Sequence, residues 1–393
     1  MNRDLSSYAK QNINKEDIDE VISVLKSDFI TQGPQVELFE KEICESTSAN
    51  YAVTTNSATS ALHIACMALD LKKGDFVWTS PITFVASANC AIYCGANIDF
   101  IDIDYKTGLI SLEALKIKLE RAQKENTLPK VIIPVHLGGV SCDMDSLFEL
   151  SKTYGFSLIE DASHALGGKY KSNLVGSCAR SSITVFSFHP VKIITTGEGG
   201  VACTNDREIA KKLYLLRSHG ITKDKKEFLL QSTEDWQYEQ QLLGYNYRMN
   251  EIQSALGRSQ LKRLKSIVKK RNYLLKIYSE LLRDTPFSLI EQPRDVYSAV
   301  HLAIIRIPQN LIKHYSNLFN GLRSIGIGTQ LHYSPVHLQP FYRNLGFTDG
   351  DFIQSEKFAK SHFSLPLYPE LEESDIKYIV KNLQDISSDL ENQ

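Results

Sequence analysis

The sequence predicts an α/β protein: a large domain with a mostly parallel β-sheet flanked by helices, and a smaller C-terminal α+β domain. Short apolar runs alternate with segments of helical period between residues 51 and 206, the pattern of strands alternating with helices. The runs are β-branched and nearly continuous, which favours strands covered on both faces. The composition then shifts after about residue 248. We therefore expect a large domain with an N-terminal arm at residues 1–250 and a small domain at residues 251–393.

The first part of the alternation predicts three strands separated by two helices. The strands are expected in YAVTT, DFVWTSPITF and NIDFIDID, and the helices in SATSALHIACMALDL and ASANCAIYC. Ser57 can cap the first helix, whose inward positions Leu62, Ala65, Cys66 and Leu69 follow the i, i+3, i+4, i+7 spacing.

Four more apolar runs end at polar residues or glycines. They are VIIPVHLGG, FSLIEDASHALGG, SSITVFSF and GGVACTND, at residues 131–139, 156–168, 181–188 and 199–206. In such sheets, ligand sites gather at the carboxyl ends of the strands. Chemistry is therefore expected where these runs end.

The C-terminal part begins with a predicted single helix over residues 249–282, with apolar positions at Ile252, Leu256, Leu264, Val268, Leu275 and Leu281. Its basic run from Lys262 to Arg271 fits a solvated helix face better than a polyanion site, because the whole chain is near neutral. EQPRD ends the pattern, HLAIIRI alternates like a half-exposed strand, and LEESDIKYIVKNLQDI closes the domain as a helix.

Charge and composition exclude several function classes. The 44 basic and 46 acidic residues give a net charge of -2, so neither nucleic acid nor an anionic membrane is an expected partner. No apolar run approaches the roughly 20 residues of a membrane helix, and the polar start does not resemble a signal peptide. Seven scattered cysteines fit a reducing, cytoplasmic setting. Cys90 and Cys94 fit a buried thiol face better than a metal clip, so no metal is expected.

The segment NSATSALHIA offers a phosphate site. Ser57 caps the helix, and the small residues Ala58 and Thr59 leave the first-turn amides open, with a hydroxyl alongside. A helix N-terminus of this kind can hold a phosphate. Taken alone, it also fits an ordinary capped helix.

Two further residues stand at strand ends. Asp161 could accept a bond from a protonated ring nitrogen or only cap the next helix, and His164 could reach the same ligand or be structural. Lys192 follows a buried run and precedes TTGEGG; apolar surroundings make such an amine nucleophilic. A phosphate-binding helix start, an aspartate for a ring nitrogen and a lysine for an aldehyde together match pyridoxal 5'-phosphate.

Over nearly its whole length the chain resembles the fold-type-I, pyridoxal-phosphate-dependent aminotransferases of the DegT/DnrJ/EryC1/StrS family, which act on nucleotide-linked keto sugars. The resemblance rests on Ser57 to Leu62, on Glu160, Asp161 and His164, on SF…K…TTGEGG, and on GYNYRMNEIQSALG at residues 244–257. It implies a homodimer with shared active sites, and a cofactor that becomes pyridoxamine 5'-phosphate during turnover.

The resemblance also implies roles for individual residues. Lys192 would form the Schiff base, Asp161 would bind the pyridine nitrogen, and His164 would face the ring hydroxyl. Ala58, Thr59 and Ser187 would hold the phosphate, and Phe84 would stack on the ring instead of serving only as core. Asn246 would reach the phosphate of the neighbouring subunit's cofactor. Tyr8, Thr31, His332 and Tyr333 would lie at the sugar nucleotide, with packing roles equally open; His189 could tune sugar recognition or only pack beneath the lysine.

HPVK, together with HYSPVH, resembles the branch of the family that serves pseudaminic acid biosynthesis. This branch implies amino transfer from L-glutamate to C4 of a UDP-linked 4-keto-6-deoxy-N-acetylhexosamine of the L-arabino form, for cell-surface glycans such as those of flagellin. A D-configured sugar linked to UDP or TDP, or a 3-keto sugar, remains an alternative.

Two rival functions share the scaffold. A sugar dehydratase would carry histidine in place of the Schiff-base lysine, whereas Lys192 is present here. A non-catalytic regulator that senses a sugar nucleotide or binds DNA would not need the lysine, aspartate and asparagine set, and the near-neutral charge gives it no footprint for nucleic acid.

Overall fold

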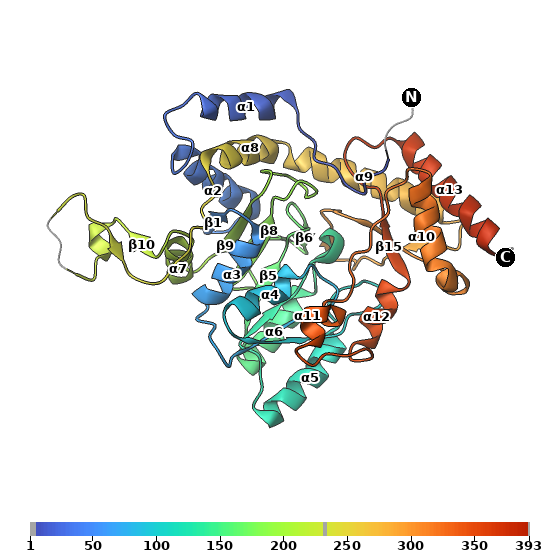
Figure 1. Cartoon of the computed structure of the whole chain (residues 1–393), viewed down its shortest axis with the longest axis horizontal. Helices are drawn as coiled ribbons and strands as arrows, with labels where there is room; N and C mark the ends of the chain where they lie inside the picture. Colours follow the sequence, from blue (N-terminus) through green and yellow to red (C-terminus); the bar gives the residue numbers. More distant parts are fainter. Residues whose placement is uncertain (1–4, 231–233, 392–393) are drawn as a thin grey trace.

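A seven-stranded sheet lies at the centre of the computed structural model, which describes residues 5–230 and 234–391 (Figure 1). The strand order is β1-β9-β8-β5-β4-β2-β3. The strands are β1 (Tyr51–Thr55), β2 (Phe76–Thr79), β3 (Asn97–Phe100), β4 (Val131–Ile133), β5 (Ser157–Asp161), β8 (Ile183–Ser187) and β9 (Gly200–Thr204). Only β9 runs antiparallel to its neighbours within this sheet. The predicted mostly parallel sheet is confirmed.

Helices cover both faces of the sheet, which explains the continuous apolar strands. On one face lie α3 (Ala58–Ala68), α4 (Ala86–Tyr93) and α7 (Arg207–Arg217); on the other lie α2 (Pro34–Thr47), α5 (Leu112–Glu125), α6 (Met144–Tyr154) and α8 (Glu251–Lys262). Neighbouring strand residues enter different cores: Val77 packs with α3 and α4, whereas Trp78 packs with α5. Successive side chains of a strand point to opposite faces, so both must be apolar.

The strand ends converge on one edge of the sheet. In the register of β1, β9 and β8, both Thr55 and Ser187 pair with Gly200. A Cβ atom on Gly200 would lie 2.5 Å from the backbone nitrogen of Ala58. Glycine is therefore needed there, because it lets the start of β9 approach the N-terminus of α3.

The C-terminal part has its own core around a three-stranded sheet. Its strands, β12 (Ser288–Leu289), β14 (Ala303–Arg306) and β15 (His362–Leu365), pack against α9 (Leu264–Leu282), α10 (Tyr315–Ser324) and α13 (Glu373–Glu391). The expectation of a half-exposed strand here is wrong. Ala303 and Ile305 enter this core while Ile304 packs against the large sheet's cluster, so β14 is buried on both faces.

The single helix expected over residues 249–282 is also wrong, because it breaks into α8 and α9 at Arg263. The Arg263 guanidinium donates to Asp17 Oδ2 of α1 (Lys15–Leu25) at 2.6 Å, and α1 packs along α8 (Figure 1). Leu264 and Val268 belong to the large-domain core. A domain boundary after residue 250 stays a prediction, since α8 itself packs on the N-terminal helices.

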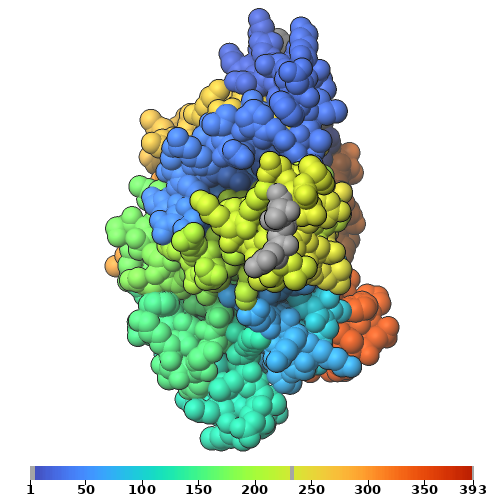
Figure 2. All heavy atoms as spheres, turned by 90° about the vertical axis from the view of Figure 1, so that its left-hand side faces the viewer, coloured from blue at the N-terminus to red at the C-terminus, as the bar shows by residue number. Residues whose placement is uncertain are grey.

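A two-stranded hairpin, β10 (Ile221–Thr222) with β11 (Glu239–Gln240), projects from the body at the left of Figure 1 and faces the viewer in Figure 2. The remaining elements are short: β6 (Lys169–Tyr170), β7 (Asn173–Leu174), β13 (Val296–Tyr297), α11 (Pro340–Arg343), α12 (Ile353–Ala359) and 3₁₀ turns at Leu137–Gly139, Lys225–Glu227, Gln309–His314 and Val336–Leu338. Among the described residues, no helix is long and apolar enough to cross a membrane.

Candidate active site

A cavity of about 640 Å³ opens at the edge where β5 and β8 end. Its walls come from the N-terminal arm, the start of α3, the loops after β2, β5 and β8, and the C-terminal domain. It gathers these predicted site residues: Tyr8, Ala58, Thr59, Phe84, Asp161, His164, Ser187, His189, Lys192, His332 and Tyr333. The sheet topology thus brings together residues more than 300 positions apart in the chain.

The N-terminus of α3 forms one wall and suits a phosphate. Ser57 is the N-cap, and its Oγ accepts from the backbone nitrogen of Ser60 at 3.1 Å. Within the described residues, the amides of Ala58 and Thr59 have no acceptor, and both residues line the cavity. Two open amides at the positive end of a helix dipole can bind an anion.

Asp161, the last residue of β5, lies almost fully buried behind the cavity. Its Oδ1 accepts from the Ser163 backbone nitrogen at 3.1 Å, and its Oδ2 accepts from the Ser87 hydroxyl at 2.6 Å. The carboxylate is therefore held by two donors from the protein. Each oxygen keeps a further lone pair for a cationic donor in the cavity.

Lys192 lies in the turn after β8, where its backbone nitrogen donates to the carbonyl of His189 at 2.9 Å. Burial lowers the pKa of the Lys192 amine from 10.5 to about 8, against the opposing pull of the Asp161 charge. Its Nζ has no hydrogen-bond or ion-pair partner in the described part of the chain. An amine with this pKa is partly unprotonated near neutral pH, as a nucleophile or base requires.

His164 is held in one tautomer. The backbone nitrogen of Gly138 donates to His164 Nδ1 at 3.2 Å, and Nε2 lies 3.1 Å from the hydroxyl oxygen of Tyr333. Burial and the nearby Lys192 charge hold the pKa of His164 well below its usual value. The ring is therefore neutral with its proton on Nε2, which donates to Tyr333.

Aromatic residues form the outer part of the cavity. The Phe84 ring is 59% exposed and lies 6.4 Å from the Tyr333 ring, centroid to centroid. Tyr8 packs edge-on against His332 at 4.8 Å, and His332 Nδ1 lies 2.8 Å from the Ser364 hydroxyl oxygen. Burial lowers the pKa of His332 to about 3, so this wall is uncharged.

Two predicted site residues lie elsewhere. Thr31 is exposed in the loop between α1 and α2, and Asn246 is exposed opposite Ser218 in an isolated bridge. Neither lines the cavity of its own chain. The role expected for Asn246 lies in a neighbouring subunit, so it stays a prediction.

Several residues of the cavity or its supporting layer were missed by sequence reasoning. Thr83, Ser163, Glu198 and Gln330 line it, and Ser87 bonds to Asp161 behind it. Thr83 lies near the end of the predicted strand DFVWTSPITF, and Ser87 lies at the start of the predicted helix ASANCAIYC, so the sequence gives no signal that they act together. Their closeness to Asp161 depends on the sheet order, which the sequence does not reveal.

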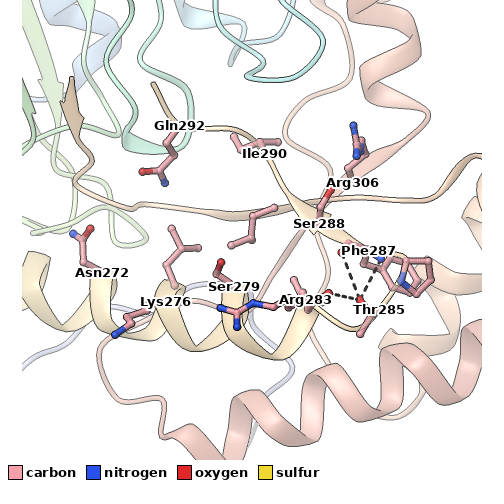
Figure 3. A pocket seen from close by; sticks show the side chains of 14 residues that line it. Asn272, Lys276, Ser279, Arg283, Thr285, Phe287, Ser288, Ile290, Gln292 and Arg306 are labelled. Carbon is pink, nitrogen blue, oxygen red and sulfur yellow. Dashed lines mark hydrogen bonds between the residues drawn. The ribbon is translucent and has the colours of Figure 1, made fainter. Parts of the chain in front are cut away.

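An open groove of about 730 Å³ on the C-terminal domain has a different character (Figure 3). It lies between α9 and β12, and Thr285 closes one end by donating to the carbonyl of Leu282 at 2.9 Å. Lys276, Arg283 and Arg306 stand at its rim. None of the predicted site residues lines it, so we assign the chemistry to the cavity at the sheet edge.

The cavity fits pyridoxal 5'-phosphate. The cofactor needs an anion site for its phosphate, a carboxylate for its ring nitrogen and an amine for its aldehyde. The open α3 amides, the two-donor Asp161 carboxylate and the Lys192 amine supply these around one cavity. Among the described residues, no group of three or more His, Cys, Asp or Glu side chains could hold a metal, and all seven cysteines are free.

Comparisons with known proteins agree with this chemistry. The model of the DegT/DnrJ/EryC1/StrS aminotransferase family matches residues 11–384. A UDP-4-amino-4,6-dideoxy-N-acetyl-beta-L-altrosamine transaminase of Campylobacter jejuni is 38% identical over 378 residues, 96% of each chain. Helicobacter pylori PseC, an aminotransferase involved in pseudoaminic acid biosynthesis, superposes with a TM-score of 0.88 at 32% identity, covering 97% of this chain and 98% of that one.

A third similar structure bears on the cofactor. Spr1654 of Streptococcus pneumoniae, solved in a pyridoxal-phosphate form, has a TM-score of 0.87 at 28% identity, over 97% of this chain and 98% of that one. Both the family match and this likeness span nearly the whole chain, and they agree with the lysine, aspartate and helix start found in the cavity. The chain is therefore a pyridoxal-phosphate-dependent enzyme and belongs to the DegT/DnrJ/EryC1/StrS aminotransferase family.

Proposed function

We propose that this aminotransferase moves the amino group of L-glutamate to C4 of a UDP-linked 4-keto-6-deoxy-N-acetylhexosamine of L-arabino configuration, in pseudaminic acid biosynthesis. The observation that carries the reaction type is the arrangement of Lys192, Asp161 and the α3 N-terminus around one cavity. The similarity to the Campylobacter enzyme and to PseC supports the acceptor. A cytoplasmic location belongs to the same proposal.

The chain's own residues would hold the cofactor. The open amides of Ala58 and Thr59, with Ser187 at the end of β8, bind its phosphate, and Asp161 accepts from its protonated ring nitrogen. Phe84, which is exposed at the cavity, would stack on the face of the cofactor ring. When bound, pyridoxal phosphate supplies an aldehyde for the donor's nitrogen and a ring that accepts an electron pair.

Lys192 moves the proton. With its pKa at about 8, the amine would take the proton from Cα of the donor as a general base and deliver it to C4' of the cofactor as a general acid. Asp161, held by two protein donors on its oxygens, would accept from the ring nitrogen and keep it protonated. The neutral His164 donates its Nε2 proton to the oxygen of Tyr333, which leaves the tyrosine's own proton for a ligand.

The sugar nucleotide occupies the outer part of the cavity. Tyr8, His332 and Tyr333 form a wall of uncharged polar rings, which suits hydroxyl groups and a nucleobase better than phosphates. His189, exposed at the cavity lip, faces the same space. Thr31 stands on the loop before α2 and would contact the ligand from outside the cavity.

A second copy of the chain would complete the site. Lys192 is the only lysine or arginine among the described residues that line the cavity, yet the reactants carry a diphosphate and two carboxylates. We infer that a second copy supplies further cations or donors. The exposed Asn246 is the group we assign to the neighbouring cofactor phosphate, and the apolar tip of the β10–β11 hairpin, with Leu229, Leu230 and Trp236 at least 74% exposed, suits burial in a homodimer.

The test uses protein loaded with pyridoxal phosphate and L-glutamate, with the UDP-linked 4-keto sugar in its L-arabino and then its D-xylo form. We expect release of 2-oxoglutarate with the L-arabino sugar and none with Lys192→Ala. Turnover confined to the D-xylo sugar would overturn the acceptor and leave the reaction type standing.

A D-configured sugar linked to UDP or TDP is the second candidate. Repeating the assay with a TDP-linked 4-keto sugar separates the two candidates. A faster reaction with the TDP sugar would favour the alternative.

A further inference from the structure

A chain of buried hydroxyl groups ends on Asp161. Thr83 Oγ1 lies 2.7 Å from Ser87 Oγ, and Ser87 Oγ lies 2.6 Å from Asp161 Oδ2. The Thr83, Ser87 and Asp161 side chains are all at most 5% exposed. Water therefore has little access to these hydroxyl groups, and the hydrogen bonds between them are stronger than exposed ones.

The direction of donation follows from the acceptor. An ionised carboxylate can only accept, so the single proton of Ser87 goes to Asp161, at a distance typical of a charge-assisted O–H···O⁻ bond. The carbonyl of Phe84, at 3.3 Å, is the weaker competitor for that proton. Thr83 then donates to Ser87, which gives a relay from Thr83 through Ser87 to Asp161.

The relay fixes how the carboxylate is turned. Ser87 holds Oδ2 from α4 while the backbone nitrogen of Ser163 holds Oδ1 from the chain after β5. Two donors from different elements set both the plane of the carboxylate and the direction of its remaining lone pairs. Without Ser87, the group could rotate about its last bond and Oδ2 would be left unpaired in a buried place.

The segment from Thr83 to Ser87 contributes to the site in two ways. Phe84 stands between Thr83 and Ser87 in sequence and points its ring into the cavity, whereas the two hydroxyls point inward. The loop is anchored from the C-terminal domain, because the backbone nitrogen of Val336 donates to the carbonyl of Pro81 at 2.9 Å. The loop before α4 thus ties ring stacking to the orientation of the aspartate.

We propose that Ser87, supported by Thr83, is a positioning residue that holds the Asp161 carboxylate aimed at the cofactor's ring nitrogen. The proposal rests on the proposed role of Asp161. The competing explanation is that the two hydroxyls only satisfy each other in the core. The two explanations predict different binding. If Ser87 positions Asp161, its loss weakens only the binding of a ligand that carries the ring nitrogen. If the hydroxyls only satisfy each other, its loss affects ligands with and without that nitrogen equally.

The test compares two ligands of the apoprotein, pyridoxal phosphate and its 1-deaza analogue, which has carbon in place of the ring nitrogen. The dissociation constants are measured by absorbance or fluorescence titration for wild type, Ser87→Ala, Thr83→Val and Asp161→Asn. Thr79→Val and Ser254→Ala are matched controls, because they remove buried hydroxyls that bond only to the carbonyls of Ile133 and Asn250.

We expect wild type to prefer pyridoxal phosphate over the analogue, and Ser87→Ala to reduce that preference roughly tenfold, as for one lost bond to a charged group. Thr83→Val, one step further back, should reduce it roughly two- to threefold. Both controls should leave the preference unchanged. An equal loss of affinity for both ligands, or no loss in Ser87→Ala, would overturn the relay's role.

The Asp161→Asn variant separates the two possible failures. If it loses the preference while Ser87→Ala keeps it, Asp161 binds the nitrogen and only the relay is wrong. If Asp161→Asn keeps the preference, the proposed role of Asp161 fails, and the relay with it.

Discussion

Lys192 combines a folding cost with a chemical use. Burial makes its charged form less stable, and the Asp161 charge offsets only part of that effect. No ion pair holds the amine among the described residues. The same burial that reduces the stability of the fold therefore keeps the amine partly unprotonated at neutral pH.

Replacing Lys192 with methionine should stabilise the apoprotein in a pH-dependent way. The folded pKa of about 8 lies below the ordinary 10.5, so the folded chain binds fewer protons between these values, and the free energy of unfolding rises with pH. The full cost applies below pH 8. We expect Lys192→Met to be more stable at pH 7 by up to about 3 kcal/mol, and the gain to shrink towards pH 10. Urea unfolding at both pH values measures this.

Lys269→Met is the control for that experiment, since Lys269 is exposed on α9. It should change the free energy of unfolding little and equally at both pH values. A Lys192→Met gain that is the same at pH 7 and pH 10 would contradict the burial argument.

The Lys192→Arg variant tests proton transfer separately from charge. Arginine keeps a cation in the cavity, but its guanidinium cannot give up a proton under these conditions. We expect 2-oxoglutarate release to fall roughly 10³-fold, the loss of a general base and nucleophile. Turnover within a few-fold of wild type would show that another group moves the proton.

At the scale of elements, Arg271 fastens α9 to the segments that support the site. It is 1% exposed, and its Nη1 contacts the carbonyls of Val300, His301 and Leu367 at 3.0–3.5 Å. The His301 ring lies 4.4 Å from the His164 ring, so this contact reaches the cavity wall. Burying a cation costs desolvation free energy, but its hydrogen bonds to these carbonyls fix where α9 packs.

Arg271→Leu should therefore destabilise the fold by about 3 kcal/mol, because the carbonyl oxygens are left unpaired in the core. Chemical denaturation of the variant measures the change in the free energy of unfolding. Lys269→Leu on the same helix serves as the exposed control. A loss under about 1 kcal/mol would mean that the carbonyls find other partners.

The sequence predicted the elements whose signals are local. The Ser57 cap and the alternating strands are both present. The break at Arg263 was missed because a helical pattern continues through it, while the bonds to Asp17 and Asn12 that hold the bend are tertiary. Likewise, β14 alternates in sequence but is covered from both sides by elements far along the chain.

For the site, the sequence predicted the groups that follow strand ends, because parallel strands deliver them to one edge. Asp161, Ser187 and Lys192 are of this kind. Ser87 and Thr83 were not found. Ser87 lies in the first turn of α4 and Thr83 lies in the loop before it, so neither directly follows a strand that ends beside Asp161. Thr31 and Asn246 lie away from the cavity of their own chain, so the roles expected for them stay predictions.

At the scale of the whole molecule, the cavity is built from parts of the chain that lie far apart in sequence. Tyr8 comes from the N-terminal arm, Asp161 and Lys192 come from the sheet, and His332 and Tyr333 come from the C-terminal part. Leu5 packs in the C-terminal core, so the arm crosses between them. Among the described residues, the lining offers one lysine and no arginine to face the negative charge of the proposed reactants.

Mixing two inactive variants tests whether the second copy supplies Asn246. In a mixed dimer of Lys192→Ala with Asn246→Asp, one site carries both changes, while the other has Lys192 from one chain and Asn246 from its partner. Random re-association makes half the dimers mixed, so we expect roughly a quarter of wild-type activity per chain.

Mixing Lys192→Ala with Asp161→Asn is the control, because both residues belong to the cavity of a single chain and no intact site can form. Recovery of 2-oxoglutarate release in the first mixture and not in the second would establish a shared site. Failure of the first mixture, with exchange verified by mass spectrometry of differently tagged chains, would confine the site to one chain, and the missing cations would then have to be sought on its own surface.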